Sequence, residues 1–473
     1  MQKSEATNSR SRLVRKATSL LATAVIMLSP MGAKAEGYQV NTLSARQLGM
    51  AHTGVAMKLG AESMIFNPAG LAFSKRTFDI TGAFTAVASE VTADAAGTKY
   101  HSNNSISTPL AFNASFRVFD NLQFGMSFYT PYGSSMNWTR DWPGSVLNQK
   151  VNLKIYNLQP TVSWRILPNL SVGAGLMLSW GSVDLNKGLV TSASMDRLLG
   201  VMAATGLSQQ MGIDPAYRFG DVCPASVNLK GKSQMSVGYN VGVMWDVSKK
   251  VTVGASFRSK MQMKVNSGDA SVSYANEIAR TVLEKDLGII NAANFKASMP
   301  APYVLTFGAA YRPIDKLTLA FDAQLTGWKT YKELKINFLN EQLSPYNQHL
   351  KKKYHNAWAF RVGGQYNITK RLDLRAGLMV DMTPVDKEHF NPETPGMTRL
   401  GPSCGLTFRP IPALSVDVSF MYVAGLGRKD ASCTYTDFLA ARMPQLGLPA
   451  QQTFKADYSL HAFTPSIGLR YEF

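Results

Sequence analysis

The sequence predicts an all-β protein: a 14-stranded antiparallel transmembrane β-barrel with an N-terminal hatch (plug) inside the lumen. Three observations lead there: low charge at a hydropathy near zero, period-two alternation, and strictly alternating short and long connections. The 473 residues are 45% hydrophobic but only 17% charged, with a mean hydropathy of −0.08. Soluble proteins carry about 25% charged residues. This balance excludes disorder, and after residue 35 no apolar run reaches the ~20 residues of a spanning helix.

Residues 1–35 predict a secretory signal peptide, cleaved after about Ala35. A basic start precedes the apolar run 20–28, and the triplet Ala33-Lys34-Ala35 closes the segment, which is the three-part signal pattern. Removing its six basic residues and one acidic residue lowers the net charge from +18 to +13. The three cysteines (Cys223, Cys404 and Cys433) form no Cys-x-x-Cys pair, so we expect neither metal nor cofactor there. Whether Cys223 and Cys433 pair stays open.

The barrel, residues 77–473, is predicted from alternation. In 317–326 one face carries Leu317, Leu319 and Phe321, and the other carries Thr318, Ala320 and Asp322. Period two indicates strands with one apolar and one polar face. The polar face also carries Arg361, Asp373, Arg375 and Asp381, which we therefore expect in the lumen.

Six short turns alternate with seven long connections, and this sets the strand count. Each short turn lies between an aromatic residue and an aliphatic residue six positions after that aromatic, as in Phe116…Leu122 and Trp164…Leu170. We place the long connections at about 91–106, 133–149, 184–232, 266–301, 337–355, 383–397 and 425–457. Short periplasmic turns, long extracellular loops and an even strand count are typical of outer-membrane barrels. A soluble β-sandwich is the alternative, but its outward face would be polar and its loops would not alternate strictly.

Residues 36–76 are rich in Gly and Ala with weak periodicity, and we expect a compact hatch inside the lumen; a disordered tail is the alternative. Two long connections, 184–232 and 266–301, show partial helical periodicity at 195–211 and 275–293. These helices would either form an apolar landing surface or merely cap the barrel.

Several motifs, in order over more than 400 residues, resemble the long-chain fatty-acid and aromatic-hydrocarbon transporters of Gram-negative outer membranes (FadL-type). They are Ser44-Ala45-Arg46 with Gly49, Asn67-Pro68-Ala69-Gly70, Thr130-Pro131-Tyr132-Gly133, Asp141-Trp142, Met299-Pro300, and Asp381-Met382-Thr383-Pro384-Val385. Tyr132 and Thr383 depart from the family, which usually has Phe and Ser there.

The resemblance implies a monomeric 14-stranded barrel, closed by the hatch, that takes up hydrophobic molecules passively across the bacterial outer membrane. Asn67, Pro68, Ala69 and Gly70 would then serve the gating of the hatch, or form an ordinary turn. A kink at Pro131 and Gly133 would open the wall sideways, because a proline removes a ladder hydrogen bond; a loop boundary is the equal alternative. The lumenal Arg361, Arg375, Asp381 and Asp322 are candidates for ligand contact, or a charge ladder in a watery interior.

Other functions are less well supported by the sequence. The six histidines lie in no nucleophile or metal-ligand motif, so we expect no enzyme. A general porin or a surface structural or adhesin protein stays as the alternative. Nucleic-acid binding lacks a basic cluster beyond Lys351-Lys352-Lys353, which we interpret as attraction to lipopolysaccharide. The aromatic C-terminal strand, which ends at Phe473, predicts contact with the outer-membrane assembly machinery.

Overall fold

The computed structural model describes residues 37–286, 292–341 and 347–473. The predicted signal peptide, 1–35, lies outside these residues. Fourteen strands, each paired antiparallel with the next, form a closed ring. They are β1 (Phe78–Thr85), β4 (Leu110–Phe119), β5 (Leu122–Asn137), β6 (Lys150–Leu167), β7 (Leu170–Val190), β9 (Ser236–Asp246), β10 (Val251–Arg258), β13 (Val304–Ile314), β14 (Leu317–Thr326), β17 (Ala357–Asn367), β18 (Leu372–Asp381), β19 (Arg399–Ile411), β20 (Leu414–Gly425) and β22 (Gln451–Glu472). The predicted barrel is confirmed, and a closed ring leaves no edge strand unpaired.

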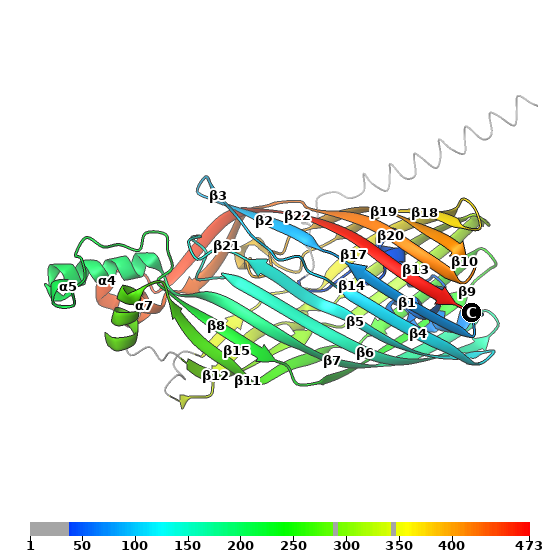
Figure 1. Cartoon of the computed structure of the whole chain (residues 1–473), viewed down its shortest axis with the longest axis horizontal. Helices are drawn as coiled ribbons and strands as arrows, with labels where there is room; N and C mark the ends of the chain where they lie inside the picture. Colours follow the sequence, from blue (N-terminus) through cyan, green and yellow to red (C-terminus); the bar gives the residue numbers. More distant parts are fainter. Residues whose placement is uncertain (1–36, 287–291, 342–346) are drawn as a thin grey trace, which may run out of the picture. The chain divides into compact units, whose positions relative to one another are not determined.

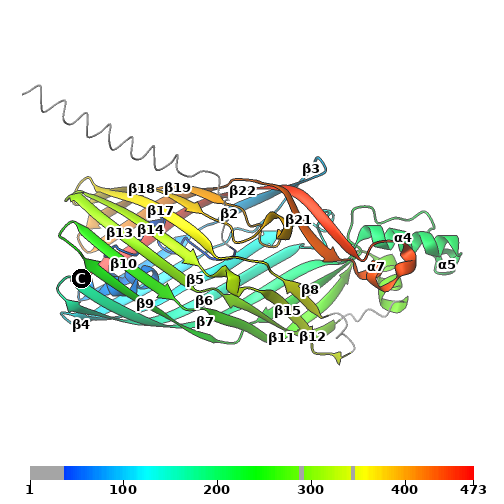
Figure 2. The same ribbon diagram turned by 180° about the vertical axis from the view of Figure 1, so that it is seen from behind.

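The seam of the ring joins the first strand to the last. Thr85 pairs with Ser466 and Asp79 with Glu472. At the bottom of the seam, Phe78 and Phe473 exchange two backbone hydrogen bonds of 2.9 and 3.0 Å. The C-terminus therefore lies at the end of the barrel that carries the six short turns (Figures 1 and 2).

The outer wall of the ring is apolar and aromatic, as the alternation predicts. The six aromatic residues before the short turns all point outward, with 44–48% of their surface exposed: Phe116, Trp164, Trp245, Tyr311, Tyr366 and Phe408. Aromatic side chains next to the short turns form the girdle that transmembrane barrels place at the membrane interface. Among the described residues, none of the helices has the length and apolarity needed to cross a bilayer.

Eight more strands extend the sheet beyond the other end of the ring. They are β2 (Ala88–Ala95), β3 (Thr98–His101), β8 (Ala225–Lys232), β11 (Met261–Tyr274), β12 (Ala292–Ala301), β15 (Glu333–Phe338), β16 (Gln348–Lys351) and β21 (Arg428–Thr436). The sequence-based assignment of 184–232, 266–301 and 425–457 to loops was thus wrong in extent. The polarity inverts there: on β6, Val151 and Leu153 point inward and Lys154 outward. In the ring the apolar side chains face outward, whereas in the extension they face inward. A search for strands with apolar residues on the outer face therefore misses the strands of the extension.

Short helices cover the far end of this extension (Figure 1). They are α4 (Ser192–Ala204), α5 (Leu207–Gln210), α6 (Glu277–Arg280), the π-helical turn η3 (Thr281–Asp286) and α7 (Phe438–Arg442) with η7 (Pro444–Leu446). Their apolar faces share one cluster that includes Leu199, Leu283 and Leu439. The helices expected at 195–211 and 275–293 are present up to residue 286, whereas residues 292 and 293 belong to β12. Residues 287–291 lie outside the described part.

Residues 37–76, called here the N-terminal segment, pack against inward-facing side chains of the ring. Its helical pieces are α2 (Ala45–Leu48), η1 (Gly60–Glu62), α3 (Ser63–Phe66) and η2 (Pro68–Phe73). Ser44 caps α2 by accepting a hydrogen bond from the Gln47 amide. Leu48, Met50 and Leu59 are fully buried, so this segment fills the lumen near the end with short turns.

Candidate functional site

A belt of inward-facing glycines seats the N-terminal segment. A Cβ on Gly363 would lie 2.6 Å from the carbonyl oxygen of Met50, and one on Gly377 would lie 2.6 Å from the amide of Ala51. Eight strands contribute one such glycine each: Gly173, Gly242, Gly254, Gly308, Gly363, Gly377, Gly405 and Gly468. Because no side chain stands between them, the backbone of the segment can approach the wall directly.

Asn67 and Asp322 fasten the segment to the wall by hydrogen bonds. The Asn67 amide donates to the carbonyls of Val55 (2.8 Å) and Val243 (2.9 Å), and its oxygen accepts from the Ala69 amide (3.1 Å). Asn67 thereby caps η2, with Pro68 at its first position. Asp322 on β14 accepts from the Gly54 amide at 2.7 Å.

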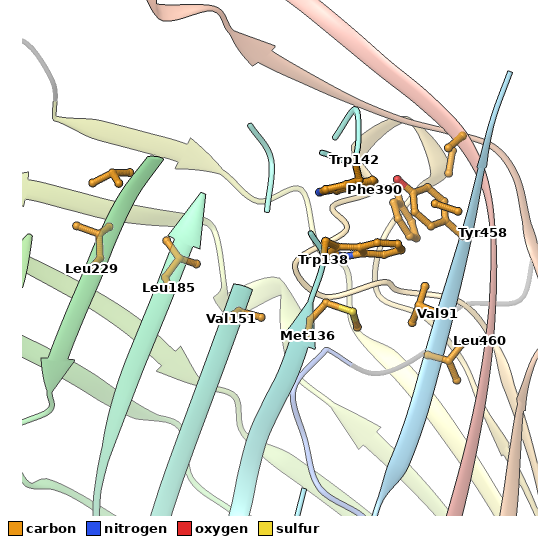
Figure 3. Packing of buried hydrophobic residues seen from close by; sticks show 14 of the residues in the cluster. Val91, Met136, Trp138, Trp142, Val151, Leu185, Leu229, Phe390, Tyr458 and Leu460 are labelled. Carbon is orange, nitrogen blue, oxygen red and sulfur yellow. The ribbon is translucent and has the colours of Figure 1, made fainter. Parts of the chain in front are cut away.

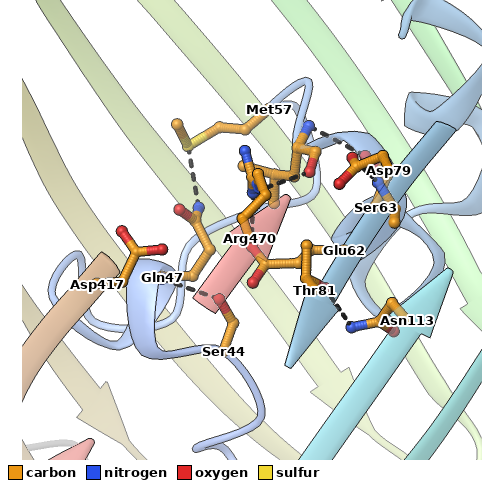
Figure 4. A network of polar contacts seen from close by, with 12 residues as sticks. Ser44, Gln47, Met57, Glu62, Ser63, Asp79, Thr81, Asn113, Asp417 and Arg470 are labelled. Carbon is orange, nitrogen blue, oxygen red and sulfur yellow. Dashed lines mark hydrogen bonds and ion pairs between the residues drawn. The ribbon is translucent and has the colours of Figure 1, made fainter. Parts of the chain in front are cut away.

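Near the short turns, a buried ion-pair network holds the segment (Figure 4). Arg470 on β22 donates to Glu62 at 3.2 Å, and Asp79 accepts from the Ala61 amide at 2.7 Å. Burial raises the pKa of Glu62, and Arg470 opposes that effect. Arg375 belongs to the same region, because it contacts Asp417 at 3.5 Å.

The first residues of the segment pair with β5 at its irregular point. The register of β5 against β6 shifts between Tyr129 and Tyr132. The Val40 amide donates to the Pro131 carbonyl, and the Gly133 amide donates to the Tyr38 carbonyl, both at 2.9 Å. The ladder between β5 and β6 thus shifts register at Pro131 and continues to Asn137, and residues 38–40 pair with β5 beside this shift, which is called here the β5 break.

A cavity of about 360 Å³ lies at this break. Val40, Thr130 and Gly133 line it, as do Asp381 on the far wall and Ile106, which is 62% exposed. It therefore extends from the lumen to the connection between β3 and β4. Whether it opens to the membrane stays a prediction.

A second pocket, on the outer side of the segment, is almost wholly apolar. Its walls come from β5, β6, β7, β8, β11, β12 and β15, with Leu153, Met263 and Phe295 among them. Leu153 and Ser134 line both this pocket and the cavity at the break. Above the pocket, Trp138 stacks on Trp142 at 4.4 Å, and the Phe390 and Tyr458 rings lie 4.2 Å apart (Figure 3).

Tyr38 forms the floor of the apolar pocket. Its ring packs edge-on against Trp328 at 4.8 Å and Tyr132 at 5.9 Å, and its hydroxyl donates to the Pro300 carbonyl. Tyr38 is buried, with 3% of its surface exposed, and it is part of the lining of the apolar pocket.

A buried charge pair stands beside the apolar pocket. Lys352 Nζ lies 3.6 Å from Glu393, which lines the pocket, and 5.8 Å from the ring centre of Tyr331. Burial is the largest single influence and lowers the pKa of Lys352, but the opposing influences, led by the Glu393 carboxylate, together raise it, so the ammonium stays charged. The interpretation of Lys351-Lys352-Lys353 as a lipopolysaccharide contact is therefore wrong for Lys352, whose partner is internal; the side chain of Lys351 lies outside the described residues.

The four lumenal candidates separate into three places. Arg361 and Asp322 line a small polar pocket beneath Val40, Asp381 lines the cavity at the break, and Arg375 lies in the ion-pair network. Sequence reasoning missed Tyr38, Lys352 and the glycine belt. The glycine belt could have been found from the sequence, because its glycines occupy positions that alternation assigns to the inward face of their strands.

The three cysteines Cys223, Cys404 and Cys433 are all free thiols, so the pairing of Cys223 with Cys433 that the sequence left open is absent. Within the described ranges, no three His, Cys, Asp or Glu side chains are grouped to hold a metal ion.

A closed 14-stranded ring with an apolar outer wall and an aromatic girdle defines a transmembrane β-barrel of the outer-membrane class. More narrowly, the chain belongs to the family of outer membrane transport proteins described as OMPP1/FadL/TodX, whose model matches residues 26–473.

Relatives agree with this assignment. The chain is 25% identical over 430 residues to outer membrane protein P1 of Haemophilus influenzae, covering 86% of this chain and 90% of that one. It is 25% identical over 421 residues to the long-chain fatty acid transport protein of Escherichia coli O6:H1, covering 86% and 91%. The protein is thus located in the bacterial outer membrane.

Solved structures share the fold. A FadL homologue of Pseudomonas aeruginosa superposes with a TM-score of 0.74 at 17% identity, over 93% of this chain and all of that one. The toluene transporter TodX of Pseudomonas putida gives 0.65 at 14% identity, over 92% and 99%.

Proposed function

We propose that the protein takes up hydrophobic small molecules, long-chain fatty acids or compounds like them, passively across the outer membrane. The observation that carries this is the contact between the apolar pocket and the cavity at the β5 break, which share Leu153 and Ser134. A ligand would enter the pocket from the outer end and leave sideways at Pro131 and Gly133. Relatives named for long-chain fatty acids and for toluene support a hydrophobic ligand.

The N-terminal segment is the hatch in this proposal. Its residues 44–74 are held by the glycine belt, Asp322, Asn67 and Arg470, so they form the fixed base. Residues 37–43 are held by the ladder to β5 and by the packing of the Tyr38 ring, and they stand between the apolar pocket and the cavity. A ligand that binds better when this strand is displaced shifts the population toward the open state. In this proposal the fixed base includes the motif Asn67, Pro68, Ala69 and Gly70, which holds residues 44–74 against the wall and does not move.

Lys352 favours ligands with a carboxylate. A fatty carboxylate that reaches the end of the apolar pocket can exchange with Glu393 for the ammonium, and charge-assisted bonds of this kind are the strong ones. Neutral hydrocarbons would use the same pocket without this contact.

Uptake of labelled oleate by cells with and without the protein tests the proposal. We expect faster uptake with the protein, and equal rates would exclude the fatty-acid version. A general porin would instead admit small sugars into proteoliposomes, and we expect none to enter because the segment fills the lumen. A monomer in native mass spectrometry is expected, and removal of Phe473 should slow insertion by the assembly machinery.

A further inference from the structure

Lysines gather on the outward face of the sheet extension, opposite the apolar pocket. Lys154 on β6 stands across from Ser182, which stands across from Lys232 on β8. The Gln234 amide, two residues after Lys232, donates to the carbonyl of Lys264 on β11. Neighbouring strands lie about 4.8 Å apart, so these ammonium groups form a row. We call the exposed set the lysine band: Lys154, Lys230, Lys232, Lys264 and Lys296.

Most of the band has no acidic partner. Lys150 and Lys335, which flank it, form ion pairs with Asp184 (3.1 Å) and Glu333 (2.8 Å). By contrast, no carboxylate of the described residues lies within ion-pair distance of Lys232, Lys264 or Lys296. Unneutralised ammonium groups on a rigid sheet attract anions from solution or from a membrane surface.

The height of the band coincides with the boundary of the membrane. Two residues inward from Lys154, Tyr156 stacks between Phe128 and Trp180, with centroids 5.9 and 6.3 Å away. Val237 and Tyr239, at the start of β9, are 61% and 53% exposed. Aromatic rings of this kind mark the interface, so the lysines stand at the level of lipid headgroups.

The opposite side of the barrel differs in charge. On β2, β3, β21 and β22 the exposed basic residues alternate with exposed acidic ones: Lys99, Lys429 and Lys455 against Glu90, Asp430 and Asp457. His101 forms an ion pair with Glu90 at 2.8 Å. The sector of the band also carries an exposed acid, Asp269, which stands across from Lys230. The uncompensated positive charge of this sector therefore centres on Lys232, Lys264 and Lys296.

We propose that the lysine band binds phosphate-bearing lipid headgroups of the outer leaflet. Ammonium groups form charge-assisted bonds to phosphate oxygens. Lys154 also lines the cavity at the β5 break. Lys232, Lys264 and Lys296 line neither that cavity nor the apolar pocket, so replacing them leaves the proposed uptake path intact.

The test compares two charge-matched triple variants, Lys232→Gln/Lys264→Gln/Lys296→Gln in the band and Lys99→Gln/Lys429→Gln/Lys455→Gln on the opposite side. Binding of a bisphosphorylated lipid A and of its dephosphorylated form is measured by native mass spectrometry in detergent. We expect the band variant to lose at least about tenfold in affinity for the phosphorylated lipid, with the control unchanged.

Equal losses in both variants, or no loss in either, would overturn the proposal. So would an equal loss for the dephosphorylated lipid, since phosphate would then not be the group recognised. Saturable binding of inorganic phosphate alone at the same lysines would point to a free anion instead. Both variants should keep wild-type oleate uptake and resistance to heat unfolding, so a failure of uptake in the wild type leaves this test intact.

Discussion

Asp322, inside the barrel wall, accepts a hydrogen bond from the backbone amide of Gly54 at 2.7 Å and a second from Val55 at 3.2 Å. One wall carboxylate thus holds a turn of the N-terminal segment from the middle of β14. The contact joins the part of the chain that fills the lumen to the part that spans the membrane.

Replacing Asp322 with alanine should loosen the segment. Loss of a charged acceptor for two buried amides costs about 1.5–3 kcal/mol. We expect faster protease cleavage within residues 44–60 and a lower urea midpoint of unfolding in detergent. Asp315→Ala, in the exposed turn before β14, is the control and should behave as wild type. Equal protease resistance in both variants would contradict the anchoring role.

Gly363 and Gly364 offer a matched pair for the glycine belt. A Cβ at Gly363 meets the Met50 backbone at 2.6 Å, whereas one at Gly364 meets the Leu319 side chain at an ordinary 3.4 Å. Gly363→Ala should therefore destabilise by about 1–3 kcal/mol through overpacking, and it should raise single-channel conductance in planar bilayers. Gly364→Ala should change neither. If Gly363→Ala and Gly364→Ala changed stability and conductance equally, the glycine belt would not be what positions the N-terminal segment.

A disulfide between residues 40 and 133 should lock the hatch. The Val40 side chain lies 3.7 Å from a Cβ placed at Gly133. In a background without Cys223, Cys404 and Cys433, Val40→Cys/Gly133→Cys should block oleate uptake when oxidised and recover it when reduced.

The control for this lock joins the fixed base to the wall. An Ala72→Cys/Ser163→Cys pair, at positions where the Ala72 amide lies 3.1 Å from the Ser163 hydroxyl, should form without loss of uptake. A block by the control pair as well would show that residues 44–74 also move.

His52 should make the segment less stable at low pH. Burial, then the charges of Arg361 and Arg258, hold its pKa well below 6.5. The Leu43 amide donates to His52 Nε2 at 3.3 Å, which fits a neutral ring. The unfolded chain binds a proton that the folded chain does not, so stability falls as pH drops below 6.5, by at most about 1.4 kcal/mol per pH unit.

The difference between wild type and His52→Gln isolates this effect from other titrating groups. We expect the two urea midpoints to converge as the pH falls from 7.5 to 5, because only the wild type loses stability through this residue. Parallel pH profiles of the two proteins would show that His52 does not control the loss of stability at low pH.

Lys352→Met should separate acidic from neutral ligands. Methionine keeps much of the volume but removes the ammonium, so oleate uptake should fall several-fold, while uptake of toluene stays the same. Glu393→Gln should do the reverse and strengthen oleate binding. If both ligands were affected alike by Lys352→Met, the lysine would serve packing rather than recognition.

The sequence predicted the ring well, because each strand has its own alternation and each turn its own proline, asparagine or lysine. The turns at Asp120-Asn121 and Thr369-Lys370 fall where the structure has them. The inverted sheet extension was missed, since there Val151 and Leu153 face a lumenal pocket and Lys154 faces out. Tyr38 and Lys352 were invisible for another reason: their partners Trp328 and Glu393 are brought near only by the closed barrel.

The seam between β1 and β22 also constrains the order of assembly. The segment that fills the lumen directly precedes β1, and its Glu62 pairs with Arg470 on the final strand. The seat is therefore incomplete until the last strand arrives. A contact between the two ends of the sequence forms slowly, so we expect the segment to reach its final packing only when the ring closes. Pairing of β22 with β1, which closes the ring, would then enclose the N-terminal segment of the same chain inside the lumen.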